Sequence, residues 1–195
     1  MIEIELPDGA KLSFEAGING LDIANKISQG LAKHALAITF NGQTQDLMTP
    51  ITTSGTVSII TGKNSQGLEI LRHTAAHILA HAVESLYPNA KATIGPVIEN
   101  GFYYDFARKE PFTTEIVDAD YPIVREMMSR KDAMAYFEKR GEPYKVEIIR
   151  DMPEDVKEVS IYTQGDYVEL CRGPHLPRTG LLGKAFKLTK VAAAY

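Results

Sequence analysis

The pattern of the first 62 residues constrains the fold more than any other feature of the sequence. Residues 2–6 alternate between apolar side chains and glutamates, as in a strand with one buried face. A turn signal at 7–9 follows, and residues 11–14 complete a hairpin. Residues 36–40 and 57–60 predict further strands. Between the hairpin and these strands, apolar residues recur at helical steps: Leu21, Ala24, Ile27, Leu31 and Ala35. This order of hairpin, helix and strands is that of a ubiquitin-like β-grasp.

The sequence after residue 62 predicts a second domain of α+β class. Residues 63–67 are polar and turn-prone, which favours a linker. A long helix is expected over 68–86, because a proline follows shortly after it. Short strands and turns are expected over 91–106 and a helix over 122–139. Residues 144–149 alternate between apolar and polar side chains, which predicts a strand.

The composition is that of a folded chain with no membrane span and no disulfide framework. Apolar residues make up 44% and charged residues 24%. No run of 18 apolar residues occurs, and the N-terminus lacks the features of a secretory signal. The single cysteine excludes an intramolecular disulfide. A cytoplasmic protein is therefore expected.

The net charge of −4 argues against a uniformly basic nucleic-acid-binding surface, but the charges are unevenly placed. Residues 1–62 contain three basic and six acidic side chains, whereas residues 171–195 contain five basic side chains and no acid. The basic segment is compatible with a local phosphate-binding surface or with a solvated edge.

Three histidines at four-residue spacing are the strongest sign of chemistry. His73, His77 and His81 fall within an arc of about 80° on a helix, at about 100° per residue. The apolar side chains of this helix form a separate arc: Leu68, Leu71, Ala75, Ile78, Leu79, Ala82 and Leu86. The histidines therefore face either solvent or a polar cleft. Thr74 excludes the zinc-protease helix, which requires glutamate after the first histidine.

The lone cysteine allows three readings. Cys171 and His175, together with His73 and His77, would form a zinc set of one sulfur and three nitrogens. The same groups suit metal-free acid–base or thiolate chemistry. A buried structural cysteine followed by a turn is the third reading, and the spacing leaves all three open.

Two further residues are weaker candidates on sequence grounds alone. Tyr104 lies in a Tyr-Tyr-Asp run of a kind more typical of packing than of chemistry. Lys145 has apolar neighbours on both sides, which is typical of the solvent side of a strand. A location in the same cleft as the histidines would give either residue a chemical role.

Five ordered motifs carry a resemblance to the N-terminal half of bacterial threonyl-tRNA synthetases. They are Arg72-His73-x-x-Ala76-His77-x-x-x-His81-Ala82, Ile94-Gly95-Pro96-Val97-Ile98, Asn100-Gly101-Phe102-Tyr103-Tyr104-Asp105, Arg140-Gly141-Glu142-x-Tyr144-Lys145 and Cys171-Arg172-Gly173-Pro174-His175-x-Pro177. Residues 186–188 and 192–195 resemble the run that leads into that family's catalytic domain. The stretch between residues 112 and 121 is shorter than expected for the family. The resemblance covers nearly the whole chain.

The resemblance implies a TGS domain of β-grasp fold at 1–62 and an α+β tRNA-editing domain at 63–195. The family's class II catalytic core, with its ATP, magnesium and zinc, and its anticodon-binding domain are expected to be absent from this sequence. The parent enzyme is then a threonine-tRNA ligase, and the activity expected here is hydrolysis of mischarged seryl-tRNA(Thr) by water. No metal or other cofactor is expected in this region.

The resemblance also implies roles for individual residues. His73, Lys145 and Cys171 match the family's catalytic editing residues, and a covalent acyl-cysteine is not expected. The substrate-binding residues that it implies are His77, Tyr104, Glu169 and His175. The family usually has Asp where this chain has Glu169, which puts the geometry of an ammonium contact in question.

The expected partner is the charged 3′ end of tRNA(Thr), with no membrane, and the full-length enzyme is expected to dimerise through the core. Two alternatives remain. One is a zinc-dependent deacylase of the alanyl-editing type, which shares the His-x-x-x-His and Cys-x-x-x-His arrangement. The other is a non-catalytic RNA-binding module, because TGS domains also occur in regulatory proteins.

Overall fold

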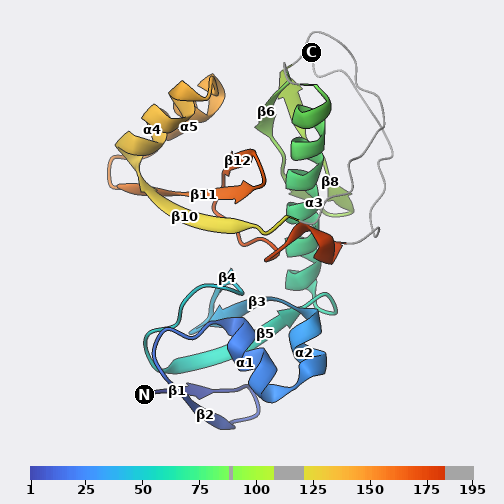
Figure 1. Cartoon of the computed structure of the whole chain (residues 1–195), viewed down its shortest axis with the longest axis vertical. Helices are drawn as coiled ribbons and strands as arrows, with labels where there is room; N and C mark the ends of the chain where they lie inside the picture. The colour runs from blue at the N-terminus through green and yellow to red at the C-terminus, as the bar shows by residue number, and fades with distance from the viewer. Residues whose placement is uncertain (88–89, 108–120, 183–195) are drawn as a thin grey trace. The chain divides into compact units, whose positions relative to one another are not determined.

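The chain folds into two units. The computed structural model describes residues 1–87, 90–107 and 121–182 (Figure 1). The first unit comprises Met1–Arg72 with Gly173–Pro177, and the second comprises His73–Arg172 with the residues from Arg178 onward. The short stretch at 112–120 and the basic residues Lys184, Lys187 and Lys190 lie outside the described residues, as do the closing motifs.

The first unit is built on one mixed sheet of five strands in the order β2-β1-β5-β3-β4. Its strands are β1 (Ile2–Glu5), β2 (Lys11–Phe14), β3 (Ala35–Phe40), β4 (Gln43–Asp46) and β5 (Gly55–Thr61). β1 runs parallel to β5, and the other pairs are antiparallel. The expected β-grasp is therefore confirmed. Its buried core includes Ile4, Ile23 and Ile38, which have no exposed surface.

The helix expected over residues 21–35 is two helices, α1 (Gly20–Ile27) and α2 (Gln29–His34). Ser28 separates them because its backbone is extended, with φ −167° and ψ 150°. The Ser28 amide donates to the Ala24 carbonyl at 2.9 Å, and its hydroxyl accepts from the Leu31 amide at 3.0 Å. Ser28 thus ends the first helix and caps the second.

Helix α3 (Ser65–Leu86) begins three residues earlier than the sequence indicates. Ser65–Gly67, which were expected in the linker, form its first turn, and the Gly67 amide donates to Asn64 Oδ1 at 3.3 Å. A Cβ at Gly67 would overlap the Thr61 carbonyl, so this start requires glycine. The domain boundary itself stays a prediction.

The second unit combines α3 from His73 onward with three small sheets. Its strands are β6 (Lys91–Ile94), β7 (Val97–Ile98), β8 (Gly101–Phe102), β9 (Asp105–Ala107), β10 (Val124–Ser129), β11 (Glu158–Gln164) and β12 (Tyr167–Leu170). β10, β11 and β12 form an antiparallel sheet, and β6 pairs with β9 and β7 with β8. A 3-10 turn, η1, spans Thr179–Leu182.

Helices α4 (Arg130–Lys139) and α5 (Pro143–Asp151) pack against the β10-β11-β12 sheet, as Figure 1 shows. The shared core includes Phe137 of α4, Ile149 of α5 and Ile161 of β11, all of them almost fully buried. The mixture of helices and antiparallel strands confirms the expected α+β class.

The sequence interpretation was wrong at two elements of this unit. Residues 124–129 form strand β10 and not a helix, because they pair with β11 from Val124↔Thr163 to Ser129↔Glu158. The helix begins only at Arg130, where the Ser129 hydroxyl accepts from the Asp132 amide.

The strand expected over 144–149 is helix α5. Pro143 occupies its first turn, where proline costs no hydrogen bond. Val146 and Ile149 are buried at a spacing of three, whereas Tyr144 and Ile148 are exposed. The apolar alternation therefore does not reflect a one-sided strand. No helix in the described parts of the chain has the length and hydropathy needed to cross a bilayer.

The start of α1 depends on a reciprocal cap that a single substitution removes. Asn19 Oδ1 accepts from the amides of Leu21 and Asp22, and Asp22 Oδ2 accepts from the Asn19 amide at 3.0 Å. We expect Asn19→Ala to lower the free energy of unfolding by about 0.5–2 kcal/mol, as measured by urea denaturation followed by circular dichroism. Glu15→Ala, at an exposed position before the helix, is the control. Equal losses in both variants would contradict the role of the cap.

Candidate functional site

A cavity of about 560 Å³ in the second unit brings together six of the seven predicted site residues. Its walls come from α3, α5, β6 and the β11-β12 strands. The predicted residues on it are His73, His77, Tyr104, Lys145, Glu169 and Cys171. Sequence positions almost 100 residues apart thus meet around one hollow.

One side of the cavity presents a thiol and two imidazoles. Cys171 Sγ lies 3.3 Å from His73 Nε2. The rings of His73 and His77, one turn apart on α3, have centroids 5.1 Å apart and an interplanar angle of 78°. The Cys171 backbone is held by Ser160, whose carbonyl accepts from the Cys171 amide at 3.2 Å and whose hydroxyl donates to the Cys171 carbonyl. The thiol is therefore placed by the end of β12 against β11.

Burial keeps the imidazole of His77 neutral. Its side chain is almost fully buried, and desolvation, followed by the charges of His73 and Lys145, holds its pKa well below the ordinary 6.5. On the histidine face of α3, His77 is buried and His73 is half-buried, so neither side chain is fully exposed to solvent. Of the two orientations open from the sequence, the cleft is the one found for His73 and His77.

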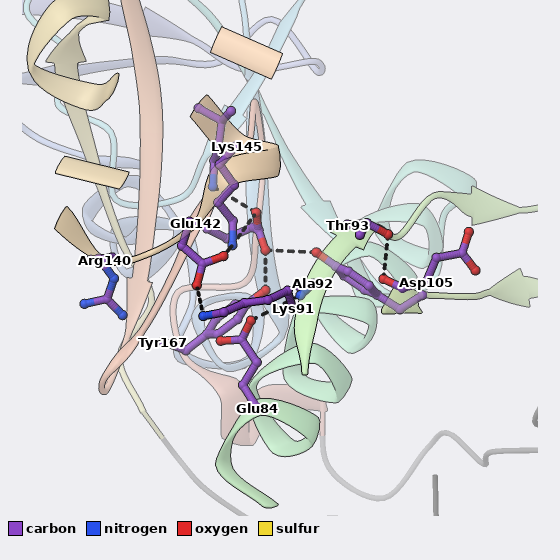
Figure 2. A network of polar contacts seen from close by, with 12 residues as sticks. Glu84, Lys91, Ala92, Thr93, Asp105, Arg140, Glu142, Lys145 and Tyr167 are labelled. Atoms are coloured by element: carbon purple, nitrogen blue, oxygen red, sulfur yellow. Dashed lines mark hydrogen bonds and ion pairs between the residues drawn. The ribbon is translucent and has the colours of Figure 1, made fainter. Parts of the chain in front are cut away.

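The other side of the cavity is a carboxylate with several donors, part of the network in Figure 2. Glu169 Oε2 accepts from the hydroxyls of Tyr104, at 2.9 Å, and Tyr167. Glu169 Oε1 accepts from the Leu170 amide at 3.0 Å and lies 3.7 Å from Lys145 Nζ. Burial, followed by the charge of Glu169, raises the pKa of both tyrosines, so the phenols remain donors. Both carboxylate oxygens are thereby fixed.

A glycine makes the Tyr104 contact sterically feasible. The Tyr104 ring lies so close to the Gly95 backbone that a Cβ at position 95 would overlap the ring carbons. Tyr104 also stacks on Phe106, with centroids 5.1 Å apart. The ring is therefore confined between a bare backbone and an aromatic face while its hydroxyl reaches Glu169.

Lys145 lies inside the cavity wall and not on the wet side of a strand. It belongs to the first turns of α5, and only 3% of its surface is exposed. Its ammonium pairs with Glu142 Oε2 at 3.2 Å and with Glu169 Oε1 at 3.7 Å. A location in the cleft is the condition under which a chemical role is expected for Lys145 on sequence grounds.

Sequence reasoning missed two members of this network, Glu142 and Tyr167. Glu142 precedes Lys145 by three residues, a helical spacing that indicates an ion pair once α5 is known to be a helix. Tyr167 stands two residues before Glu169 in β12, so the two side chains share a face of the strand. Reading residues 144–149 as a strand concealed the first signal.

His175 and His81 are not among the residues that line this cavity. His175 belongs to the segment grouped with the first unit, where its ring is buried and its amide donates to Asp46 Oδ1 at 2.9 Å. Its predicted place in the substrate pocket stays a prediction. His81 stacks on Tyr167, with centroids 5.5 Å apart, and lines a separate cavity of about 40 Å³ with Gln164 and Tyr121. Burial lowers its pKa.

Three side chains of the second unit could hold a metal ion. One ligand atom from each of His73, His77 and Cys171 lies within 4.8 Å of the others. Zinc takes nitrogen ligands at about 2.0–2.1 Å and sulfur at about 2.3 Å, so closure around an ion needs only small side-chain shifts. The donor set fits zinc by chemistry as well as by proximity.

Comparison with known proteins identifies two domain types. Residues 2–61 match the TGS domain, and residues 159–193 match the threonyl and alanyl tRNA synthetase second additional domain. The second match covers β12 and all of β11 except Glu158, and it includes Glu169 and Cys171.

The chain is also similar along its whole length to curated bacterial proteins. It is 54% identical to a threonine-tRNA ligase of Rhodospirillum rubrum, 52% to one of Hyphomonas neptunium and 50% to one of Acidithiobacillus ferrooxidans. The chain spans about a third of the length of these relatives, 32%, 31% and 32% respectively. The first alignment has 206 positions against 195 residues here, so that relative contains residues with no counterpart in this chain.

The neutral state of His77 predicts a loss of stability in acid. Below pH 6.5 the unfolded chain binds a proton at His77 that the folded chain does not, so stability falls as the pH drops toward the lowered folded pKa. The limiting slope is about 1.4 kcal/mol per pH unit. We expect His77→Gln to flatten the slope between pH 6.5 and 5, measured by urea denaturation at each pH. His34→Gln, at an exposed histidine of the first unit, is the control, and identical slopes for His77→Gln and wild type would contradict this account.

Proposed function

The chain belongs to the threonyl-tRNA synthetase family, and on that premise we propose that the cavity of its second unit hydrolyses the ester of mischarged seryl-tRNA(Thr). One observation carries the proposal: the imidazole–thiol pair and the lysine–carboxylate–tyrosine group lie on the same cavity. An ester hydrolase needs both an acceptor for the proton of water and fixed polar groups around the reacting ester.

A separate hydrolytic site is useful because binding energy alone discriminates poorly between serine and threonine. Serine lacks one methyl of threonine, a difference worth about 1–3 kcal/mol, or about 10- to 200-fold, in a binding pocket. A synthetic site can exclude larger amino acids by size but admits the smaller serine. A second site in which a fixed ester leaves no room for the threonine methyl reverses the direction of the size test. It removes the wrong product and spares the correct one.

The proposed reaction adds water across the ester. The water oxygen bonds to the carbonyl carbon, the bond from that carbon to the ribose oxygen breaks, and the ribose oxygen takes up a proton. His73 is assigned to orient the water and accept its proton, and Lys145 to stabilise the charge on the reacting and departing oxygens. Cys171 is assigned to hold the His73 ring through the 3.3 Å contact or to contact the seryl group, without forming an acyl-enzyme.

The remaining residues shape the pocket in this proposal. His77, neutral because it is buried, packs beside His73, and Tyr104 forms a wall. Glu169 is assigned to the seryl ammonium, and His175 to the closure of the pocket. Each Glu169 oxygen already has two contacts, so an incoming ammonium shares this carboxylate with the tyrosines and Lys145. Glu169 therefore has a second task, to hold those groups in place.

The proposal also covers the full-length enzymes of this family. By this reading the whole enzyme is a cytoplasmic threonine-tRNA ligase whose partner is tRNA(Thr), with the charged 3′ end entering the cavity. ATP, magnesium and zinc then serve a catalytic core, which is also the expected dimer surface. The editing reaction in the second unit is proposed to use no metal.

The decisive measurement is a pair of deacylation assays. We expect the chain to release serine from seryl-tRNA(Thr) and to leave threonyl-tRNA(Thr) intact, because the pocket rejects the extra methyl. His73→Ala should lower kcat by about 10²- to 10⁴-fold, the usual contribution of general acid–base catalysis. Cys171→Ala should lower it as well, with no acyl-protein detected by mass spectrometry in wild type.

The control for these variants is His34→Ala, which alters an exposed histidine of the first unit. Full activity after His73→Ala or Cys171→Ala would overturn the residue assignment. Binding of tRNA without turnover, unaffected by either change, would instead support a non-catalytic RNA-binding module.

A zinc-dependent deacylase is the second candidate, and the proximity of His73, His77 and Cys171 favours it. In that case these three residues hold the ion, and bound zinc would lower the pKa of a water to supply the nucleophile. Lys145 and Glu169 keep the roles of charge stabilisation and positioning described above.

Metal analysis separates the two candidates. In the metal-free proposal, protein purified without chelator contains substoichiometric zinc, and dialysis against a chelator leaves the deacylation rate unchanged. Stoichiometric zinc that is lost together with activity, and restored together with it, would establish the second candidate. His73→Ala should reduce zinc content only in that second case, which links the metal to this site.

A further inference from the structure

Glu142 is a buried acidic residue that none of the roles above uses. It stands at the N-terminal boundary of α5, where a carboxylate commonly caps the helix, yet its side chain makes no capping hydrogen bond. Only 7% of Glu142 is exposed. Its carboxylate instead contacts two ammonium groups, Lys145 Nζ at 3.2 Å and Lys91 Nζ at 3.0 Å. The side chain is therefore committed to lysines and not to the helix.

Lys145 needs such a partner because its charge is buried. Its ammonium lies over two aromatic rings, 5.8 Å from the Phe137 centroid and 6.0 Å from the Tyr167 centroid. Rings attract a cation only weakly compared with a carboxylate. Glu169 is the second carboxylate within reach, at 3.7 Å, and it also serves Tyr104. Of the two carboxylates, Glu142 is the closer to Lys145.

Glu142 also joins two walls of the cavity. Lys91 begins strand β6, which contributes Thr93 and Ile94 to the lining, and Lys145 contributes from α5. Figure 2 shows Glu142 between the two lysines, with one oxygen toward each. A single carboxylate thus fixes the position of α5 relative to β6.

We propose that Glu142 is a positioning residue for the editing reaction, which holds the Lys145 ammonium against Glu169 and in the cavity. The proposal deepens the function given above and rests on it. Glu142 does not touch substrate and acts through Lys145. It orients the Lys145 ammonium from a position three residues earlier in the chain, and it balances the buried charge of that ammonium.

Within the part of the chain that the structure describes, Glu142 and Glu169 are the carboxylates within ion-pair distance of Lys145. Glu84 is the remaining acid that senses this charge cluster, but burial raises its pKa, and it accepts a backbone amide from Ala92 at 3.4 Å. Among the described residues, replacement of Glu142 by glutamine would leave Lys145 with Glu169 as its only close carboxylate and Lys91 with none. A buried cation whose partner is removed reorients toward water.

The test compares Glu142→Gln, which keeps the shape and removes the charge, with wild type in single-turnover and steady-state deacylation of seryl-tRNA(Thr). We expect kcat to fall by about 10- to 100-fold, since small displacements of a catalytic group have effects of this size. KM should change little, because Glu142 touches no substrate. Glu142→Asp, which keeps the charge on a shorter arm, should recover part of the loss.

A double-mutant cycle distinguishes positioning from general support of the fold. Lys145→Met removes the ammonium that Glu142 is proposed to orient, so adding Glu142→Gln to this variant should cause little further loss of rate. Additive losses would overturn the proposal. Glu3→Gln is the matched control, because it removes the carboxylate of an exposed pair with Lys11, 2.8 Å apart in the first unit, and should leave the rate unchanged.

A second readout does not depend on catalysis. Lysine acylation by acetic acid N-hydroxysuccinimide ester, followed by mass spectrometry, should label Lys145 slowly in wild type and faster in Glu142→Gln, relative to Lys11. Unchanged labelling of Lys145 would overturn the positioning role even if the deacylation assays succeed. If wild type fails to deacylate seryl-tRNA(Thr) while labelling rises as expected, the proposed function fails and the lysine-holding role of Glu142 stands.

Discussion

The cavity of the second unit depends on the enclosure of one ammonium group, Lys145, between two carboxylates. A buried charge is costly to desolvate and is tolerated only with close partners. Glu142 and Glu169 supply them from different elements, at 3.2 and 3.7 Å. The position of α5 against β12 is therefore set by charge as well as by the apolar contacts of Phe137 and Ile149. The arrangement gives a rigid polar wall in an otherwise apolar packing.

The two sides of the cavity differ in charge for a physical reason. Near Lys145, two acids and two phenols accommodate a full positive charge. Near Cys171, burial, followed by the charges of His73 and Lys145, lowers the pKa of His77 and keeps its imidazole neutral. His73, on the same face of α3, is the proposed acceptor of the proton from water. In the proposed reaction, acceptor chemistry and charge stabilisation thus belong to different groups that line one cavity, which suits attack by water on an ester bound there.

The sequence predicted the β-grasp unit and the meeting of imidazoles, thiol and lysine better than the elements that carry them. The alternation along β1 predicts a strand with one buried face. The four-residue spacing of His73 and His77 predicts that both lie on one face of a helix, and both signals are local. Residues 144–149 are ambiguous, because Val146 and Ile148 alternate as in a strand while Val146 and Ile149 recur as in a helix. Pairing of residues 124–129 with β11 overrides their helical spacing and cannot be seen without the partner strand. The pairing of Glu142 with Lys145 was missed because residues 144–149 were interpreted as a strand and not as part of helix α5.

Selectivity against threonine cannot come from the size of the cavity alone. A volume of about 560 Å³ greatly exceeds a seryl group and leaves ample room for one more methyl. Discrimination by a methyl requires that the ester be fixed first, so that the methyl meets a wall and not open space. The groups able to fix it are the polar ones that are themselves fixed: Lys145, Glu169 and Tyr104, the last confined against Gly95. In the proposed reaction, the rigidity of this buried network therefore determines accuracy as well as rate, because any freedom in Lys145 or Tyr104 enlarges the effective pocket.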